Sequence, residues 1–219
     1  MSVTQSPQNV GFWWKAVAGI LLASTLVVTC WVLLHRNGLP YQDQFARRSL
    51  DGWTPHGGNW QVVDGIVTNR SNESGSRLVT GSEDMADYRL NAQVRLTNTY
   101  GDAGLVFRMT ESEEGTNAFY GYYAGMRFPD MLVLARMDYG FQPLRIVKLP
   151  QPVRPGTWYQ LSVQAKGCTL SVQARDDRGQ VLAEADAIDQ DECQKHGNFG
   201  LRSFAAGGSW RHVAAQALQ

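Results

Sequence analysis

Residues 88–97 read YRLNAQVRLT, and this stretch decides the fold. Every second residue from Tyr88 to Leu96 is apolar or aromatic, whereas the residues between them are polar or charged. Successive side chains of a β-strand point to opposite faces, so this alternation predicts a strand that is buried on one face only. Such a strand belongs to an antiparallel sheet that packs on a second layer and leaves its other face in water.

Short segments rich in β-branched and aromatic residues continue on both sides of this stretch, and turn signals such as Asp64-Gly65 separate them. No segment after residue 40 has a sustained helical period. The pattern predicts an all-β domain built as a two-sheet antiparallel jelly-roll sandwich. The expected strands are 60–63, 66–69, 77–80, 88–97, 103–109, 118–126, 131–138, 144–149, 158–166, 169–175, 180–185, 198–204 and 210–215.

Residues 16–34, AVAGILLASTLVVTCWVLL, are of another kind, because none of their side chains is charged. As a helix this run is about 28 Å long, close to the thickness of a bilayer's hydrocarbon core. Aromatic and basic side chains flank it, as at membrane interfaces. These belt residues are Trp13, Trp14, Lys15, Trp31 and Arg36. We therefore expect a retained single-pass transmembrane helix with the lipid bilayer as a partner. The alternative is a cleaved signal peptide, but no small-x-small cleavage site follows Leu34.

The expected organisation has four parts. A short tail covers residues 1–14, the transmembrane helix 15–36, a Gly- and Pro-containing linker 37–57, and the β-sandwich 58–219. Small residues on the helix form a candidate packing face for other membrane helices. They are Gly19, Ala23 and Ser24.

Charge and cysteine content limit the partners and the compartment. The chain has 20 basic and 20 acidic residues and no basic run, which gives no support for nucleic-acid binding. Cys168 and Cys193 are the only cysteines of the expected sandwich. A bridge between them would close a loop of about 25 residues, contribute about 3 kcal/mol and imply an oxidising compartment. Two separate buried thiols are the alternative, because spacing alone cannot place the two Cα atoms.

Several short motifs follow one another in a recognisable order: Gly58-Asn59-Trp60, Val63-Asp64-Gly65, Ala103-Gly104-Leu105, Phe107-Arg108, Gly121-Tyr122-Tyr123, Pro155-Gly156-Thr157-Trp158 and Gly197-Asn198-Phe199-Gly200-Leu201. This succession resembles the concanavalin A-like lectin/glucanase superfamily over about residues 50–217. It is nearest to laminin-G-like and 3-keto-disaccharide-hydrolase-type domains. The resemblance implies two curved sheets and an extracytoplasmic domain. We therefore expect a protein of the bacterial inner membrane with its C-terminal domain in the periplasm.

Catalytic and metal-binding patterns are weak. The superfamily's glucanases carry Glu-x-Asp-x-x-Glu on one strand, and this chain lacks that motif. Its histidines have no zinc-site spacing. Its acidic clusters fall in expected loops, namely Glu111/Glu113/Glu114, Asp176/Asp177 and Asp189/Asp191/Glu192. We predict no catalytic residue, no metal and no cofactor. The alternative for the last cluster is a calcium ion, as laminin-G-like domains sometimes hold.

A candidate ligand face contains Arg108, Tyr122 and Arg136. Strand alternation places Tyr122 opposite to Phe119 and Tyr123, and the two arginines could fork sugar hydroxyls. Ordinary outward-facing Tyr and Arg are the alternative, since strands favour aromatic residues. The expected function is a non-catalytic interaction or scaffolding subunit of a larger membrane complex, with membrane proteins as partners. The alternative is a carbohydrate-binding module at the cell envelope with a glycan as partner, and a glycan hydrolase comes third.

Overall fold

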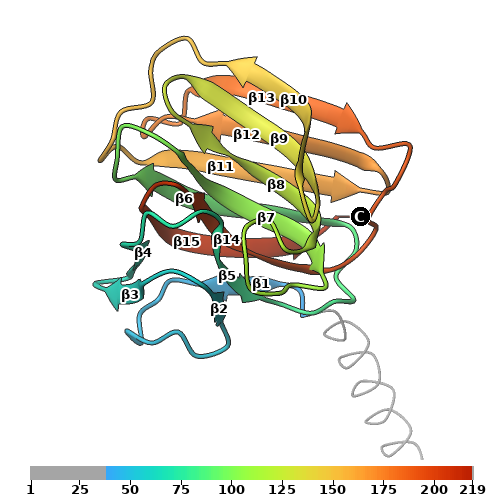
Figure 1. Ribbon diagram of the computed structural model, residues 1–219, viewed down its shortest axis with the longest axis horizontal. Helices are drawn as coiled ribbons and strands as arrows, with labels where there is room; N and C mark the ends of the chain where they lie inside the picture. Colours follow the sequence, from blue (N-terminus) through green and yellow to red (C-terminus); the bar gives the residue numbers. More distant parts are fainter. Residues whose placement is uncertain (1–37, 219) are drawn as a thin grey trace, which may run out of the picture. The chain divides into compact units, whose positions relative to one another are not determined.

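The computed structural model describes residues 38–218, and these form a sandwich of two antiparallel β-sheets with no helix among them. Figure 1 shows the two layers, whose strands run in similar directions. The all-β, two-sheet prediction is therefore confirmed. The expected transmembrane helix, with its belt and its packing face, lies outside the described residues. Within residues 38–218 no helix has the length and hydropathy that a membrane crossing requires.

Sheet A has eight strands in the order β13-β12-β11-β6-β15-β4-β3, with β1 paired to β15. Its central strands carry the alternating pattern from which the fold was predicted. The bounds are β1 Tyr41–Asp43, β3 Trp60–Val63, β4 Ile66–Asn69, β6 Tyr88–Leu96, β11 Tyr159–Lys166, β12 Thr169–Arg175, β13 Val181–Ile188 and β15 Gly208–Ala217.

Sheet B has seven strands in the order β10-β9-β8-β7-β14-β5-β2. Its central strands are buried on both faces, so their sequences are apolar almost throughout. The bounds are β2 Thr54–His56, β5 Ser76–Thr80, β7 Asp102–Thr110, β8 Tyr120–Arg127, β9 Met131–Asp138, β10 Phe141–Lys148 and β14 Asn198–Phe204.

The main core lies between the sheets and receives alternate side chains from both. Trp210 of β15 is fully buried, and its indole N–H donates to the carbonyl of Gly104 on β7 at 3.0 Å. This bond joins sheet A to sheet B and satisfies a polar group that burial would otherwise leave unpaired. A second, smaller core covers the outer face of sheet B, around Val106, Phe119 and Tyr123.

The expected linker over 37–57 needs correction, because it contains two short strands of the sandwich. Residues of β1 pair with β15 and residues of β2 pair with β5. Phe45 and Trp53, which lie between them, are 1% and 6% exposed, and the ring of Tyr41 contacts that of Phe199 edge-on at 5.1 Å. The two strands were not predicted because three residues among Gly and Pro show too little alternation to indicate a strand.

Gly104 is a position where the sheet depends on the absence of a side chain. A Cβ there would lie 2.1 Å from the Ala124 carbonyl oxygen and 2.4 Å from the Gly125 Cα. We expect Gly104→Ala to lower the free energy of unfolding by about 1–3 kcal/mol, the usual cost of overpacking. Urea unfolding followed by Trp fluorescence measures this. In the control Gly140→Ala the nearest atom lies 3.5 Å away, so a change within about 0.5 kcal/mol is expected. Equal losses in both variants would contradict the argument.

Candidate functional site

The outer face of sheet A carries rows of polar side chains that cross five strands. The antiparallel register sets Gln93 of β6 opposite Gln160 of β11, and Asn91 opposite Ser162. On the next pair of strands Gln173 lies opposite Ser162, and Glu184 of β13 opposite Gln173. Residues directly opposite each other point to the same face, so amides and hydroxyls meet across the strands.

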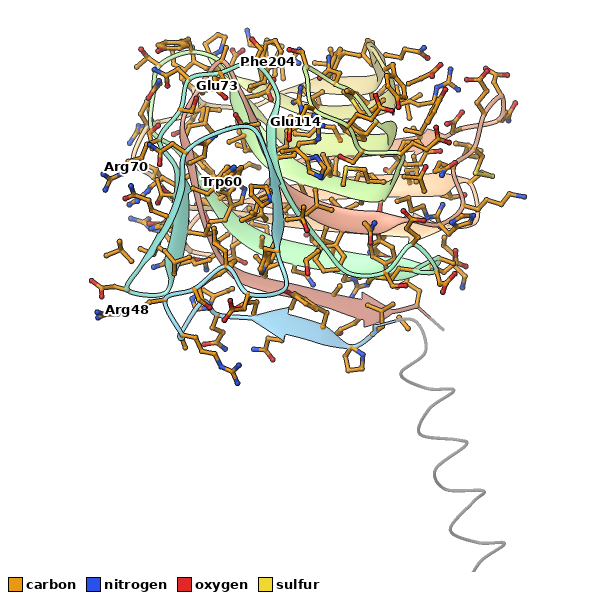
Figure 2. The ribbon with its side chains drawn as sticks, turned by 60° about the horizontal axis from the view of Figure 1, so that its bottom comes forward. Arg48, Trp60, Arg70, Glu73, Glu114 and Phe204 are labelled. Carbon is orange, nitrogen blue, oxygen red and sulfur yellow. A yellow bond between two sulfur atoms is a disulfide. The ribbon has the colours of Figure 1, made fainter. Side chains whose placement is uncertain are left out.

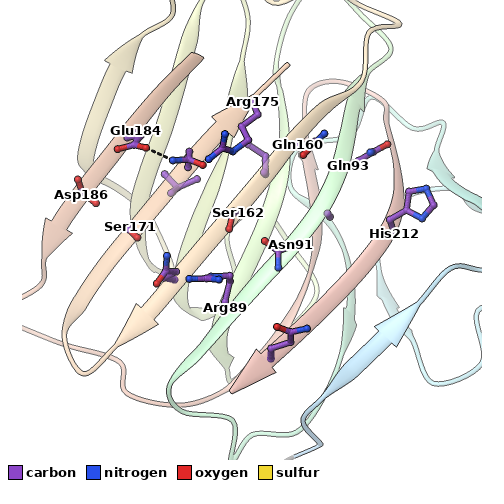
Figure 3. A pocket seen from close by; sticks show the side chains of 16 residues that line it. Arg89, Asn91, Gln93, Gln160, Ser162, Ser171, Arg175, Glu184, Asp186 and His212 are labelled. Carbon is purple, nitrogen blue, oxygen red and sulfur yellow. Dashed lines mark hydrogen bonds between the residues drawn. The ribbon is translucent and has the colours of Figure 1, made fainter. Parts of the chain in front are cut away.

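These rows enclose a groove of about 670 Å³. Asn91 and Ser162 have short side chains and lie in its middle row (Figure 3). Arg89 and Gln164 flank this row on one side, and Gln93 and Gln160 on the other. On β6 and β11 the groove therefore has short side chains in its middle row and long ones in the rows beside it. Glu184, Asp186 and Arg175 extend the same surface over β12 and β13.

Several groove side chains have unused hydrogen-bonding capacity. Asn91, Gln160 and Ser162 make no side-chain hydrogen bond to any described residue. Other side chains of the face are held by local bonds. Gln173 Nε2 donates to Glu184 Oε1, and Arg175 Nη1 donates to the Gly179 carbonyl at 2.9 Å. The groove thus presents fixed charged groups beside free amide and hydroxyl groups, which both donate and accept.

An aromatic residue adjoins one end of the groove. Trp158 lines a neighbouring cavity of about 390 Å³ that shares Gln93 and Gln160 with the groove. The guanidinium carbons of Arg95 and Arg211 lie 4.6 and 4.3 Å from the centre of a Trp158 ring. Cation–π contacts of this kind fix the indole in place.

His212 reaches the groove from a bulge in β15. The register of β15 against β6 shifts between Arg211 and Ala214, and His212 has φ 54°, a left-handed value that is unusual for a residue other than Gly. Its side chain is exposed and lines the groove (Figure 3). Bulges of this type re-aim a side chain and often lie beside functional sites.

In the structure, the residues of the predicted ligand face make contacts within the protein. They are Arg108, Tyr122 and Arg136. The three residues do lie together, and they hold the β13–β14 connection. Tyr122 is fully buried, donates to Asp189 Oδ2 at 2.9 Å and accepts from the Gln194 N–H at 2.9 Å. Burial, with Asp189 second, raises the pKa of Tyr122 well above its usual value, so its hydroxyl keeps the proton it donates.

Both arginines are engaged by the same connection. Arg108 is fully buried; its Nη2 pairs with Asp87 Oδ1 at 2.8 Å and its Nη1 donates to the carbonyls of Gly167 and Gln194. Arg136 Nη1 pairs with Asp189 Oδ1 at 3.1 Å. The alternation rule failed at Arg108 because β7 has a bulge between Phe107 and Thr110, where Arg108 takes φ 48°.

The structure contains the Cys168–Cys193 disulfide, with the two Cα atoms 5.6 Å apart. It ties the β13–β14 connection to the turn between β11 and β12. The acidic cluster considered for calcium is used here for structure, because Asp189 contacts Tyr122 and Arg136, and Glu192 lies 3.7 Å from Arg136. Within residues 38–218, no group of three or more His, Cys, Asp or Glu side chains is placed to hold a metal ion.

The groove was not among the predicted sites, although the sequence contains a signal for it. Strands β11 and β12 carry nearly the same sequence, LSVQAK at 161–166 and LSVQAR at 170–175. In the antiparallel register Ser162 faces Gln173 and Gln164 faces Ser171, so the two copies build one local two-fold array. The outward positions Ser162, Gln164, Ser171 and Gln173 are amides and hydroxyls in both copies.

The fold and this surface define a concanavalin A-like β-sandwich. The model of one family, the 3-keto-alpha-glucoside-1,2-lyase-like domain, matches residues 41–214, and the chain belongs to this family. No curated protein matches the sequence.

Solved structures share the fold at low sequence identity. The carbohydrate-binding module CBM66 from Bacillus subtilis is 20% identical with a TM-score of 0.61, over 76% of this chain and 96% of that one. A Lotus tetragonolobus seed lectin is 9% identical with a TM-score of 0.62, over 81% and 97%. The exoplasmic/lumenal domain of VIP36, in a form bound to Ca²⁺ and Man3GlcNAc, is 11% identical with a TM-score of 0.58, over 81% and 87%.

Asp189 offers a test of how the β13–β14 connection is held. Its carboxylate is 2% exposed and contacts both Tyr122 and Arg136. We expect Asp189→Asn to lower the free energy of unfolding by about 1–3 kcal/mol, because Arg136 loses its buried partner. Thermal and urea unfolding measure the change. The control Asp191→Asn alters an exposed carboxylate two residues away and should change stability by less than about 0.5 kcal/mol. A similar loss in the control would count against this role.

Proposed function

We propose that this protein binds a neutral glycan chain in the groove on the outer face of sheet A. The observation that carries the proposal is the array of free amides and hydroxyls that the sheet register assembles across its strands. Sugar hydroxyls donate and accept hydrogen bonds at once, and Asn, Gln and Ser side chains can do both. An open groove that crosses several strands fits a chain better than a single sugar.

The comparisons support carbohydrate binding in general, whereas the neutral glycan and its groove are part of this proposal. Carbohydrate-binding modules and lectins share the fold, and one of them was solved with an oligosaccharide bound. Trp158, held by Arg95 and Arg211, adds an apolar edge at the end of the groove. The location at a membrane, with the sandwich in the periplasm, remains part of the proposal and rests on the apolar run at 16–34. The scaffolding role expected from the sequence remains a prediction.

Glycan cleavage is the second candidate function. The position of His212 in the groove favours it. Its left-handed backbone in a bulge places an exposed imidazole at one edge of the groove, while Glu184 and Asp186 of β13 lie at the opposite edge, four strands away. Imidazole and carboxylate groups are the usual proton carriers in catalysis. The family description refers to a lyase, which is consistent with such chemistry. Mass spectrometry of any bound oligosaccharide after incubation tests this: cleavage that His212→Gln abolishes would establish it, and an intact oligosaccharide would exclude it.

Glycan binding is tested with the full chain in a detergent that has no sugar headgroup. A glycan array identifies ligands, and titration calorimetry measures affinity. Ser162→Tyr should fill the middle of the groove and weaken binding at least tenfold. Asn91→Ala should weaken it about 3- to 30-fold, the value of one or two hydrogen bonds.

The matched control is Thr169→Tyr, which adds the same ring to an exposed position of β12 that does not line the groove. Its affinity should equal that of the native chain. Failure to bind any neutral glycan, or binding that Ser162→Tyr leaves unchanged, would refute the proposal.

A further inference from the structure

A second pocket lies on the other sheet, at the end of the sandwich where three turns meet. Residues of the β6–β7, β8–β9 and β14–β15 connections line a cavity of about 500 Å³. Four aromatic rings form much of its wall, those of Tyr100, Phe128, Phe141 and Phe204. We call this the aromatic pocket. It shares no lining residue with the groove of sheet A.

The polar part of the aromatic pocket is a buried ionic cluster. Asp102 is 2% exposed and lies between two guanidinium groups, with Arg202 Nη1 at 3.1 Å from Oδ1 and Arg127 Nη2 at 3.2 Å from Oδ2. Tyr123 also donates to Asp102 Oδ1 at 2.7 Å. Both oxygens of the carboxylate are therefore occupied. Asp102 positions the two arginines and has little capacity left for a ligand.

Positive charge exceeds negative charge in this buried region. Arg77 is fully buried and bonds to backbone carbonyls, including that of Gly115 at 3.0 Å, and not to a carboxylate. Burial and then the nearby charge of Arg202 lower the pKa of Arg77 to about 10, while Glu114 opposes them. Three guanidinium groups thus accompany one buried carboxylate.

Negative side chains at the rim do not cancel this excess. Glu73 and Glu114 lie at the same end of the molecule as Phe204 (Figure 2), and both carboxylates approach the position of a Cβ on Gly57. Both residues are exposed, so solvent screens their charge more than that of the buried arginines. The rim carboxylates therefore offset the charge of the arginines only in part.

The free charged and amide groups of the aromatic pocket are hydrogen-bond donors. Arg127 uses Nε and Nη2 for Asp102, and its Nη1 makes no hydrogen bond within residues 38–218. Asn117 accepts from Arg202 Nη2 through Oδ1, which leaves its Nδ2 group without a partner among these residues. Arg202 is 1% exposed and its Nε also has no partner there. Hydrogen-bond donors that lack an acceptor suit an anionic ligand, whereas the groove of sheet A offers both donors and acceptors.

We infer that the aromatic pocket binds a sugar acid. Its carboxylate accepts from Arg127 Nη1 and Asn117 Nδ2, and its pyranose ring lies against the aromatic wall. The Arg127 guanidinium is held 4.7 Å from the Phe141 ring centre, so the charged group is positioned before the ligand arrives. Tyr100 is 49% exposed, and its hydroxyl can both donate to and accept from a ring hydroxyl. This site is independent of the proposed neutral-glycan groove.

The test uses the full chain and titration calorimetry with D-glucuronate, D-glucose and benzoate. We expect saturable binding of glucuronate, with glucose and benzoate each at least tenfold weaker. The key variant is Asn117→Asp. Asp tolerates the left-handed backbone at this position, where φ is 57°, and still accepts from Arg202. It removes the Nδ2 donor and adds a negative charge, so the fold should persist while glucuronate affinity falls at least tenfold.

Three further variants separate this site from the groove and from nonspecific charge. Arg127→Gln should also weaken glucuronate binding at least tenfold, whereas Arg154→Gln, which changes an exposed arginine outside the pocket, should not. Ser162→Tyr should leave glucuronate binding intact even where it abolishes neutral-glycan binding. Equal affinity for glucose or benzoate, unchanged binding in Asn117→Asp, or loss of glucuronate binding in Ser162→Tyr would each overturn the inference.

Discussion

Packing of alternate side chains between the two sheets is the constraint on which the rest of the structure depends. Leu90, Val163 and Val172 are completely buried in the shared core, and this burial fixes the register of β6, β11 and β12. A shift of one residue would turn each apolar set toward water. Because the inward residues fix the register, the residues between them must also meet across the strands. The polar array on the outer face is therefore a product of core packing.

The sandwich could be predicted from sequence because its long strands show a strict two-residue period, as at 88–97. The candidate site could not, because it depends on pairing between distant strands and on departures from that period. At Arg108 a bulge turned a predicted ligand residue into an anchor for the β13–β14 connection, which also covers Tyr122. In β1 and β2 the strands were too short for any period to show.

The two proposed sites, one on each sheet, offer a ligand different groups. The groove of sheet A combines fixed charged groups with free amides and hydroxyls that donate and accept, whereas the aromatic pocket of sheet B places Asp102 and its arginines beside aromatic walls. Buried charges are costly, and two guanidinium groups on one carboxylate, with the buried Arg77 nearby and without a carboxylate of its own, are hard to explain by stability alone. Ionic networks that a fold does not need are often part of a binding site, and this cluster has free donors at its accessible edge.

The groove runs across the strands and not along them. Neighbouring strands lie about 4.8 Å apart, so crossing five of them covers about 19 Å in nearly equal steps. The near-identical sequences of β11 and β12 make two of those steps chemically alike. The two copies run antiparallel, however, so Ser162 lies beside Gln173 and Gln164 beside Ser171, and the array repeats after a half-turn and not after a shift by one strand. A chain lying across these two strands would therefore meet the same groups in either direction.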